Sequence, residues 1–451
     1  MTPPRPSQDA PRVGAALMLS SVAGLARSPY QFWVDQYRRH GPVYQIRLPD
    51  GRGDLVVLAG GEANRLLHED GRRLFSTAAT YPRAPILIKT NAHPSFRDDA
   101  VGLELRAALA KGFQRKAIAP QVPAILAWMR AEADALEAGQ AFNVASETSR
   151  MGLEAVSFFS TGRPLQMSPE RLRSYAAVFT GVIALGWPMA GWKNPWMQGI
   201  SEEFRAMVRD ELDRHRHHPP GPTRPPDYFD HLMQMKLGGV ALPDAVWEEF
   251  GRLPFKNMAV YAGRVINHVL YDLVSQPEML DFVRDEVDLL GRTPASEADM
   301  TVLDAMPRLR ACIMESLRIR PVAVALQRTV EEEFTFEGFY FSKGDELMIP
   351  IGAPHLMEEY FPEPERYDPT RFLGDRAEHR QGSVYAPFGV GHHSCVARGL
   401  FEAITQMVVG TLLHQWTLRA DYDLITWVDV LPGPLPLHRM DVVERRVPAS
   451  A

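Results

Sequence analysis

Residues 385–410, YAPFGVGHHSCVARGLFEAITQMVVG, constrain the fold most, because they place a cysteine between a glycine-rich loop and a long apolar run. The apolar run predicts a buried helix. Cys395 would then lie at a helix N-terminus, where the helix dipole and free N–H groups favour its thiolate. Gly389 and Gly391 allow the loop to turn sharply and to approach a ligand closely. Such a thiolate suits nucleophilic catalysis or ligation of a soft metal centre, whereas an arbitrary cysteine is more often buried and inert.

The composition argues against several other classes of protein. Cys312 is the only other cysteine in 451 residues, which indicates a reducing compartment and thiols that act singly. A formal net charge of -6 argues against general nucleic-acid binding. The apolar run at 13–26 contains serines and is shorter than the roughly 20 residues of a membrane span. It resembles a signal peptide only faintly. We therefore expect a soluble, cytoplasmic protein with no membrane span and no nucleic-acid partner.

The pattern of apolar residues predicts a mainly α-helical chain with a minor β component. Residues 41–60 predict a β-hairpin, and residues 331–352 predict a second small sheet. The histidine- and proline-rich residues 215–228 predict an exposed loop between helices. Helices are predicted at 98–117, 121–138, 170–186, 201–216, 246–275, 277–290, 307–319 and 396–416.

The spacing Phe388-Gly389-x-Gly391-x-His393-x-Cys395 resembles the haem-ligand loop of the cytochrome P450 family. Three further segments resemble motifs of that family and occur in its order: ESLR at 315–318, AVALQRTV at 323–330 and FPEPERYDPTRF at 361–372. The resemblance covers nearly the whole chain. It implies the family's triangular-prism fold, with a helix-rich and a small sheet-containing region. It also implies a single domain at residues 28–451 that follows an N-terminal extension at 1–27.

The resemblance further implies haem b as the cofactor and Cys395 as the ligand of its iron. Carboxylates such as the haem propionates are best held by arginine or cationic histidine. For this role the resemblance indicates Arg106, Arg328 and His393. The alternative for Arg106 is that it is an ordinary surface arginine that does not contact the haem. Phe388 and Gly389 complete the cofactor-binding residues. Gly102 stands where the family usually has a histidine or tryptophan, which puts one propionate contact in doubt.

A buried ion network on the cysteine's side of the haem is also implied by the resemblance. Its members would be Glu315, Arg318 and Arg371. We assign this network to folding and haem retention and not to chemistry, because removing one partner of a buried ion network leaves an unpaired charge.

The distal helix, at 252–279, departs most from the family's pattern. The segment AGRVIN at 262–267 is similar to the oxygen-activation motif, yet it places Val265 and Ile266 where the family has an acid and a threonine. We prefer the register set by Pro277, which places Val260 and Tyr261 there. Neither register supplies the acid–alcohol pair, so Tyr261 is the candidate catalytic residue for proton delivery. The alternative is that Tyr261 only forms part of the pocket wall. Arg264 fits an ion-pair or solvent-facing role better than substrate binding.

The substrate pocket and the redox partner are assigned by position within the family. Tryptophan and methionine residues at 171–207 favour a bulky hydrophobic substrate, although they could also form core. The predicted pocket residues are Ile86, Leu87, Trp187, Asn257, Val260, Ala262 and Val324. The basic residues Lys111, Arg115 and Lys116 would attract an acidic ferredoxin or flavodoxin, although a solvated helix face explains them nearly as well.

Three functional hypotheses follow. The first is a bacterial haem-thiolate monooxygenase of specialised metabolism, monomeric and acting on a hydrophobic small molecule. The second is a haem-thiolate isomerase, dehydratase or peroxide-driven enzyme, because the acid–alcohol pair is missing. The third is a haem-binding sensor or carrier. Dependence of turnover on oxygen and a reductase separates the first two, and absence of turnover with any oxidant favours the third.

Overall fold

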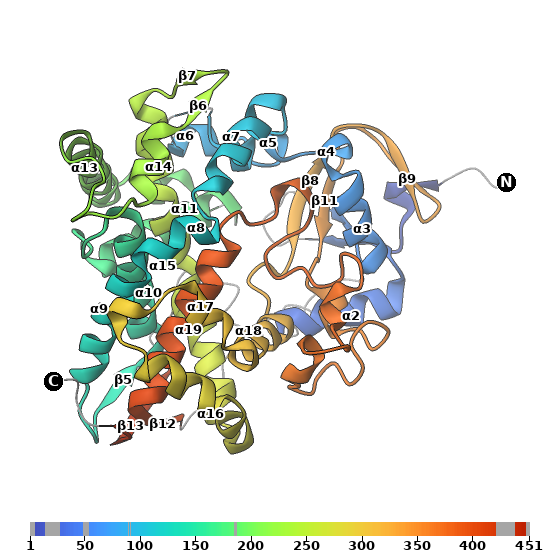
Figure 1. The fold of residues 1–451 in the computed structure, drawn as a ribbon. Coiled ribbons are helices and arrows are strands. Elements are labelled where there is room, and N and C mark those ends of the chain that lie inside the picture. Colours follow the sequence, from blue (N-terminus) through green and yellow to red (C-terminus); the bar gives the residue numbers. More distant parts are fainter. Residues whose placement is uncertain are drawn as a thin grey trace.

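The computed structural model describes residues 5–13, 28–47, 54–88, 90, 92–184, 187–420 and 438–447. Helices make up most of it, and a smaller sheet-containing part lies beside the helix-rich part (Figure 1). The predicted mainly α fold class with a minor β component is therefore confirmed. In the described part of the chain, no helix combines the length and apolarity that crossing a membrane requires.

The helix-rich part contains α7 (Ala100–Lys111), α8 (Arg115–Ile118), α9 (Val122–Asp134), α10 (Val144–Thr161), α11 (Pro169–Ala184), α12 (Met189–Lys193), α13 (Pro195–His217), α14 (Tyr228–Gln234), α15 (Asp244–Val274), α16 (Pro277–Arg292), α17 (Met300–Asp304), α18 (Pro307–Ile319) and α19 (Arg398–Gln415). The segments nearer the sheets include α2 (Pro29–His40), α3 (Gly61–Glu69), α4 (Gly71–Leu74), α5 (Thr77–Thr80) and α6 (Ala84–Ile88). Short 3-10 turns that matter below are η2 (Pro94–Phe96), η6 (Pro369–Phe372) and η8 (Gly391–His393).

The largest described sheet has the strand order β2-β3-β11-β8-β4, formed by β2 (Val43–Arg47), β3 (Asp54–Leu58), β11 (Glu346–Ile349), β8 (Leu326–Val330) and β4 (Phe75–Ser76). Strands β2 and β3 are antiparallel, which confirms the hairpin predicted at 41–60. The other sheets are β1 (Arg5–Pro6) with β10 (Phe339–Phe341) and β9 (Phe334–Phe336); β12 (Trp416–Ala420) with β13 (Arg439–Arg445) and β5 (Ala141–Asn143); and β6 (Lys236–Leu237) with β7 (Val240–Ala241).

Residues 5–13 belong to the predicted N-terminal extension, and they pack against the sheets. Arg5 pairs with Phe339 in a parallel ladder, and the side-chain amide of Gln45 donates to the carbonyl oxygens of Gln8 (2.6 Å) and Ala10 (3.0 Å). Part of the extension is thus integrated into the fold, while the division into residues 1–27 and 28–451 stays a prediction.

Two sequence-based expectations about the elements need correction. The helix predicted at 98–117 is two helices, because α7 ends at Lys111 and α8 begins at Arg115. The loop predicted as exposed at 215–228 is partly buried: His215 still belongs to α13, and its Nε2 lies 2.9 Å from the carboxylate of the buried Asp227. Arg224 donates to Asp227 as well, so paired charges hold this proline-rich segment against the helix.

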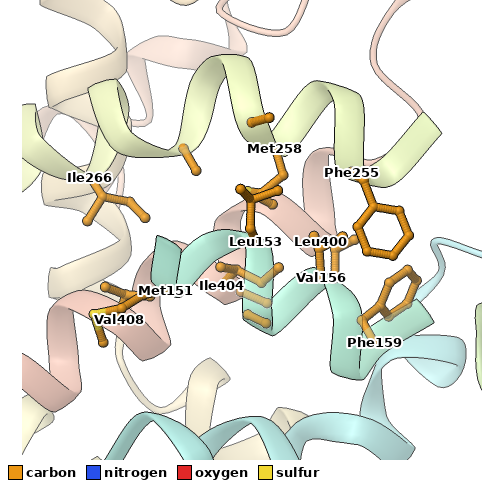
Figure 2. Close-up of a cluster of buried hydrophobic side chains, with 14 of the residues drawn as sticks. Met151, Leu153, Val156, Phe159, Phe255, Met258, Ile266, Leu400, Ile404 and Val408 are labelled. Carbon is orange, nitrogen blue, oxygen red and sulfur yellow. The ribbon is translucent and has the colours of Figure 1, made fainter. Parts of the chain in front are cut away.

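The core that positions the site forms where α10, α15 and α19 meet. Figure 2 shows Met151, Leu153, Val156 and Phe159 of α10 facing Phe255, Met258 and Ile266 of α15, with Leu400, Ile404 and Val408 of α19 beside them. Helices α10 and α15 approach closely because glycines lie at the contact. A Cβ atom at Gly152 would lie 2.8 Å from the Cβ of Ala262, and one at Gly263 would lie 2.2 Å from the carbonyl oxygen of Ala145.

Candidate functional site

The cysteine loop is shaped by two glycines and one backbone hydrogen bond. Gly389 and Gly391 have positive φ angles of 80° and 68°, a region that glycine enters without strain. A Cβ atom at Gly391 would also lie 2.7 Å from the carbonyl oxygen of Leu67 in α3. The amide of Cys395 donates to the carbonyl oxygen of Phe388 (2.8 Å), which closes the loop just before α19 begins. The loop therefore presents Cys395 in a fixed position.

The thiol of Cys395 faces an internal cavity. Its side chain is exposed, yet burial by the surrounding protein raises its pKa, because the exposed surface is the cavity wall and not the outside of the molecule. The amide of Ala397 and the guanidinium groups of Arg106 and Arg398 oppose that rise in pKa. An anionic sulfur is thus stabilised by a hydrogen bond and two cations, and a metal ion would add to this.

The cavity has a volume of about 310 Å³. Its walls come from α15, from the cysteine loop with the start of α19, from η2 and α7, and from the segment at 322–328. Most of the wall is apolar, and Leu109, Phe113, Val156, Met258, Leu400 and Phe401 contribute to it. A flat apolar cofactor with charged edges would be accommodated by such a cavity.

Three basic side chains reach this cavity, and all three were predicted to bind the cofactor. They are Arg106 of α7, Arg328 of β8 and His393 of η8. Burial lowers the pKa of Arg106 and of Arg328, although Cys395 opposes that shift for Arg106, and Tyr81 and Asp98 oppose it for Arg328. Arg328 donates to the carbonyl oxygen of Gln327 (2.7 Å) and hydrogen-bonds the Tyr81 phenol. The wall thus offers guanidinium groups suited to the propionates of haem, so the residues present fit that cofactor.

Asp98, the residue that holds His393, was not predicted as a site residue. An Oδ1 atom of Asp98 lies 2.8 Å from Nε2 of His393 and 3.4 Å from Nε2 of His392. Its Oδ2 atom accepts from the amides of Thr77 (2.8 Å) and Ala78 (3.2 Å) at the start of α5. Burial raises the pKa of Asp98, but the hydrogen bonds from both histidines and from the Ala78 amide outweigh it and lower that pKa overall. An anionic Asp98 therefore fastens the cysteine loop to α5.

The distal wall contains Tyr261 and Asn257 of α15. Burial raises the pKa of Tyr261, while the nearby Arg264 cation opposes that rise. The Arg264 guanidinium lies 5.8 Å from the centre of the Tyr261 ring. Among the described residues that line this cavity, none is an aspartate or glutamate. Tyr261 thus lies where the sequence placed it, on the same cavity as Cys395, while its catalytic role stays a prediction.

Several predicted substrate residues lie away from this cavity. Val260 and Ala262 are buried in the core, and Ala262 packs against Gly152 of α10. Leu87 is also buried, whereas Ile86 and Trp187 are 63% and 38% exposed. Val324 packs in a separate cluster near β3 and α2. Of the seven predicted pocket residues, Asn257 is the one among the described lining residues of this cavity, and the substrate-binding role of all seven stays a prediction.

The predicted ion network is present beneath the loop. Glu315 accepts two hydrogen bonds from Arg318 (2.7 and 2.9 Å) and one from Arg371 of η6 (3.3 Å). All three side chains are fully buried. Arg371 also pairs with Glu378 (3.1 Å), and Arg318 donates to the carbonyl oxygen of His355 (2.7 Å). The network ties α18 to the segment that precedes the cysteine loop, which is consistent with a structural role.

Comparison with known proteins gives one family. A family model for Cytochrome P450 matches residues 264–423. Cyclooctat-9-en-7-ol 5-monooxygenase of Streptomyces melanosporofaciens is 26% identical over 434 residues, which are 92% of this chain and 91% of that protein. Lithocholate 6-beta-hydroxylase of Mesocricetus auratus is 31% identical over 153 residues, which are 34% of this chain and 30% of that protein. The structure of retinoic acid bound cyanobacterial CYP120A1 has a TM-score of 0.76 at 19% identity, covers 93% of this chain and 95% of its own, and shows the shared fold.

Proposed function

The chain belongs to the cytochrome P450 family of haem-thiolate monooxygenases, and we propose that it binds haem b and oxidises a hydrophobic small molecule with O2 and electrons from a redox partner. One observation carries this proposal: Cys395, Arg106, Arg328 and His393 line a single apolar cavity. When bound, a haem with a thiolate ligand supplies the electron density that favours cleavage of the O–O bond.

Each wall of the cavity has a distinct part in this proposal. Cys395 would ligate the iron, and Arg106, Arg328 and His393 would hold the propionates, with Phe388 and Gly389 shaping the loop. The Phe388 ring lies under the Arg398 guanidinium, 5.5 Å from it, which holds the ring beside the cysteine. The apolar remainder of the cavity excludes water and favours a hydrophobic substrate. The bacterial relative is named for action on cyclooctat-9-en-7-ol, which supports a substrate of low polarity.

Proton delivery is where this enzyme differs from the family's usual arrangement. The Tyr261 phenol is neutral because burial raises its pKa, so it can donate a proton in a hydrogen bond. We propose that the Tyr261 hydroxyl donates protons into the cavity, a role that the usual acid and threonine would otherwise share. A redox-neutral or peroxide-driven reaction is the second candidate, because the described cavity wall contains no carboxylic acid.

The proposed electron donor is an acidic ferredoxin or flavodoxin that meets a monomeric enzyme. Lys111 lies in α7 and Lys116 in α8. Both lysines are exposed and could attract such a partner. Arg115 is exposed too, but it forms an ion pair with Asp304, which reduces its contribution.

The test is turnover of a panel of hydrophobic compounds by the haem-loaded protein. We expect a product that contains an oxygen atom from O2, formed only when a ferredoxin or flavodoxin and its reductase are present. Turnover without O2 and without electrons would favour the isomerase or dehydratase. Turnover with hydrogen peroxide alone would favour the peroxide-driven enzyme. No turnover with any oxidant would contradict the proposal and favour a sensor or carrier.

A further inference from the structure

Three charged side chains lie buried on α15, one to three turns before Tyr261. Glu249 accepts hydrogen bonds from Arg252 and from Lys256, whose Nζ is 2.6 Å from Oε1. Glu249 and Arg252 are fully buried, and Lys256 is only 4% exposed. We call these three residues the α15 charge cluster. They lie within an apolar core, where burying a charge is costly unless it is fully paired.

The α15 charge cluster has one carboxylate for two cations. Of the titratable neighbours, His93 and Tyr175 add no negative charge. Burial lowers the pKa of His93 to about 3, so that this histidine is neutral, and its Nε2 is 3.8 Å from Glu249. Burial raises the pKa of Tyr175 to about 12, so that this phenol, which accepts from Arg252, is neutral too. The Glu248 carboxylate acts on Arg252 from a distance, but it is itself paired with Arg205 (2.6 Å) and Arg209 (3.3 Å).

Arg252 and Lys256 also have N–H donors that are not used within the α15 charge cluster. Among the described residues, Nε of Arg252 has no hydrogen-bond partner although it is buried. Lys256 donates to Glu249, and its Nζ lies 4.4 Å from the centre of the Phe179 ring, so the described part of the chain gives a hydrogen-bonding partner to one of its three N–H donors. Burial lowers the pKa of Lys256; Glu249 opposes that shift, and the Arg252 cation adds to it.

The α15 charge cluster lies next to cavity-lining residues along the helix, although its own three side chains are not among those that line the cavity. Leu253 and Asn257 both line the cavity, and Lys256 lies one turn after the first and directly before the second. His93, beside Glu249, directly precedes Pro94 and Ser95, which line the cavity as well. The ammonium of Lys256 ends a flexible four-carbon chain, so a change of rotamer is enough to turn it toward a ligand.

We propose that Lys256, supported by Arg252, recognises an acidic group of the substrate, so that the substrate class is a hydrophobic molecule with a carboxylate. This inference rests on the proposed function and names its substrate class. The carboxylate would supply the negative charge that the α15 charge cluster lacks, through charge-assisted hydrogen bonds. The apolar cavity wall would hold the rest of the molecule.

The test uses calorimetric titration of the haem-loaded protein with alkanoic and cyclic carboxylic acids of graded size, each beside its methyl ester. We expect at least one acid to bind roughly tenfold more tightly than its ester, or better, as a hydrogen bond between charged groups requires. In Lys256→Met that difference should shrink to about threefold or less, while the ester's affinity stays the same. Lys193→Met, which removes an exposed lysine of α12, is the matched control and should keep the preference.

Two results would overturn the inference: no acid in the panel is preferred over its ester, or the preference survives in Lys256→Met. Glu249 keeps Arg252 as a partner in that variant, so the melting temperature should not fall. A large fall would assign Lys256 to folding instead. If Lys256→Met does not retain haem, Lys256→Gln replaces it in the same comparison. Failure of the proposed function is distinguishable, since it would appear as a missing thiolate spectrum in the unmodified protein.

Discussion

Individual residues carry the chemistry of this site, and the sequence revealed them unevenly. Cys395 was found because a glycine-rich loop before an apolar helix is a local pattern, and the structure places its thiol in the cavity. Asp98 was not found, because its partners His392 and His393 are distant in sequence and only the fold brings them together. The burial of Lys256 was not predicted either, because the local sequence does not indicate whether a lysine within an apolar helix is buried.

Tyr261→Phe removes the phenol hydroxyl and keeps the bulk of the ring. If Tyr261 delivers protons, reductase-driven product formation should fall by roughly tenfold or more, as expected for loss of a general acid. More of the consumed oxygen should be released as peroxide, while substrate affinity changes little. The measurement is the ratio of product to electrons consumed. An unchanged ratio would assign Tyr261 to the pocket wall. In that case Tyr261→Ala should alter the affinity for substrate, and Tyr261→Phe should not.

At the scale of elements, most of the longer helices were predictable because their apolar residues recur with helical spacing. The predicted helices at 277–290 and 307–319 correspond to α16 and α18. Helix α10 was not predicted, because serines, threonines and glycine interrupt its apolar pattern. Those small residues are needed at the close contact with α15, where Thr148 donates to the carbonyl oxygen of Gly263 (3.2 Å). The helix that sets the position of the distal wall was therefore the least visible in the sequence.

Gly263→Ala should destabilise the contact between α10 and α15. Its Cβ would lie 2.2 Å from the carbonyl oxygen of Ala145, a backbone atom, so the helices must separate. We expect the free energy of unfolding to fall by about 1–3 kcal/mol, as in overpacked cores. Guanidinium unfolding measures this change.

The matched control is Gly199→Ala, in α13, where an added Cβ has no atom within 4 Å. Alanine has the higher helix propensity, so this change should raise stability by about 0.5–1 kcal/mol. Equal effects of the two substitutions would contradict the close-contact explanation for Gly263.

At the scale of the whole molecule, two buried neutral histidines connect stability to pH. His355 links α18 to the cysteine loop: its Nδ1 donates to the carbonyl oxygen of Arg318 (3.1 Å), and its Nε2 accepts from the Ala386 amide (2.7 Å). Burial, reinforced by Arg318, lowers the pKa of His355 to about 3. Burial also lowers the pKa of His93 to about 3. The fold as a whole therefore resists protonation at both positions.

Stability should consequently fall as the pH is lowered. Below the unfolded-state pKa of about 6.5, the unfolded chain binds protons that the folded chain does not, so the loss begins there and continues toward pH 3. Each histidine should contribute a loss of about 2 kcal/mol by pH 5. Urea unfolding between pH 7 and pH 5 measures the slope, and His355→Asn should make it shallower. A slope that is flat in the unmodified protein, or unchanged in the variant, would contradict this account.

The central claim, that Cys395 ligates the haem iron, is tested most directly by the absorption spectrum of the reduced, haem-loaded protein with carbon monoxide. We predict the red-shifted Soret band that is diagnostic of thiolate ligation. The band should be lost in Cys395→Ser and kept in Cys312→Ala, because Cys312 is fully buried away from the cavity and burial raises the pKa of its thiol. A thiolate band that persists in Cys395→Ser, or that is absent from the haem-loaded unmodified protein, would contradict the assignment.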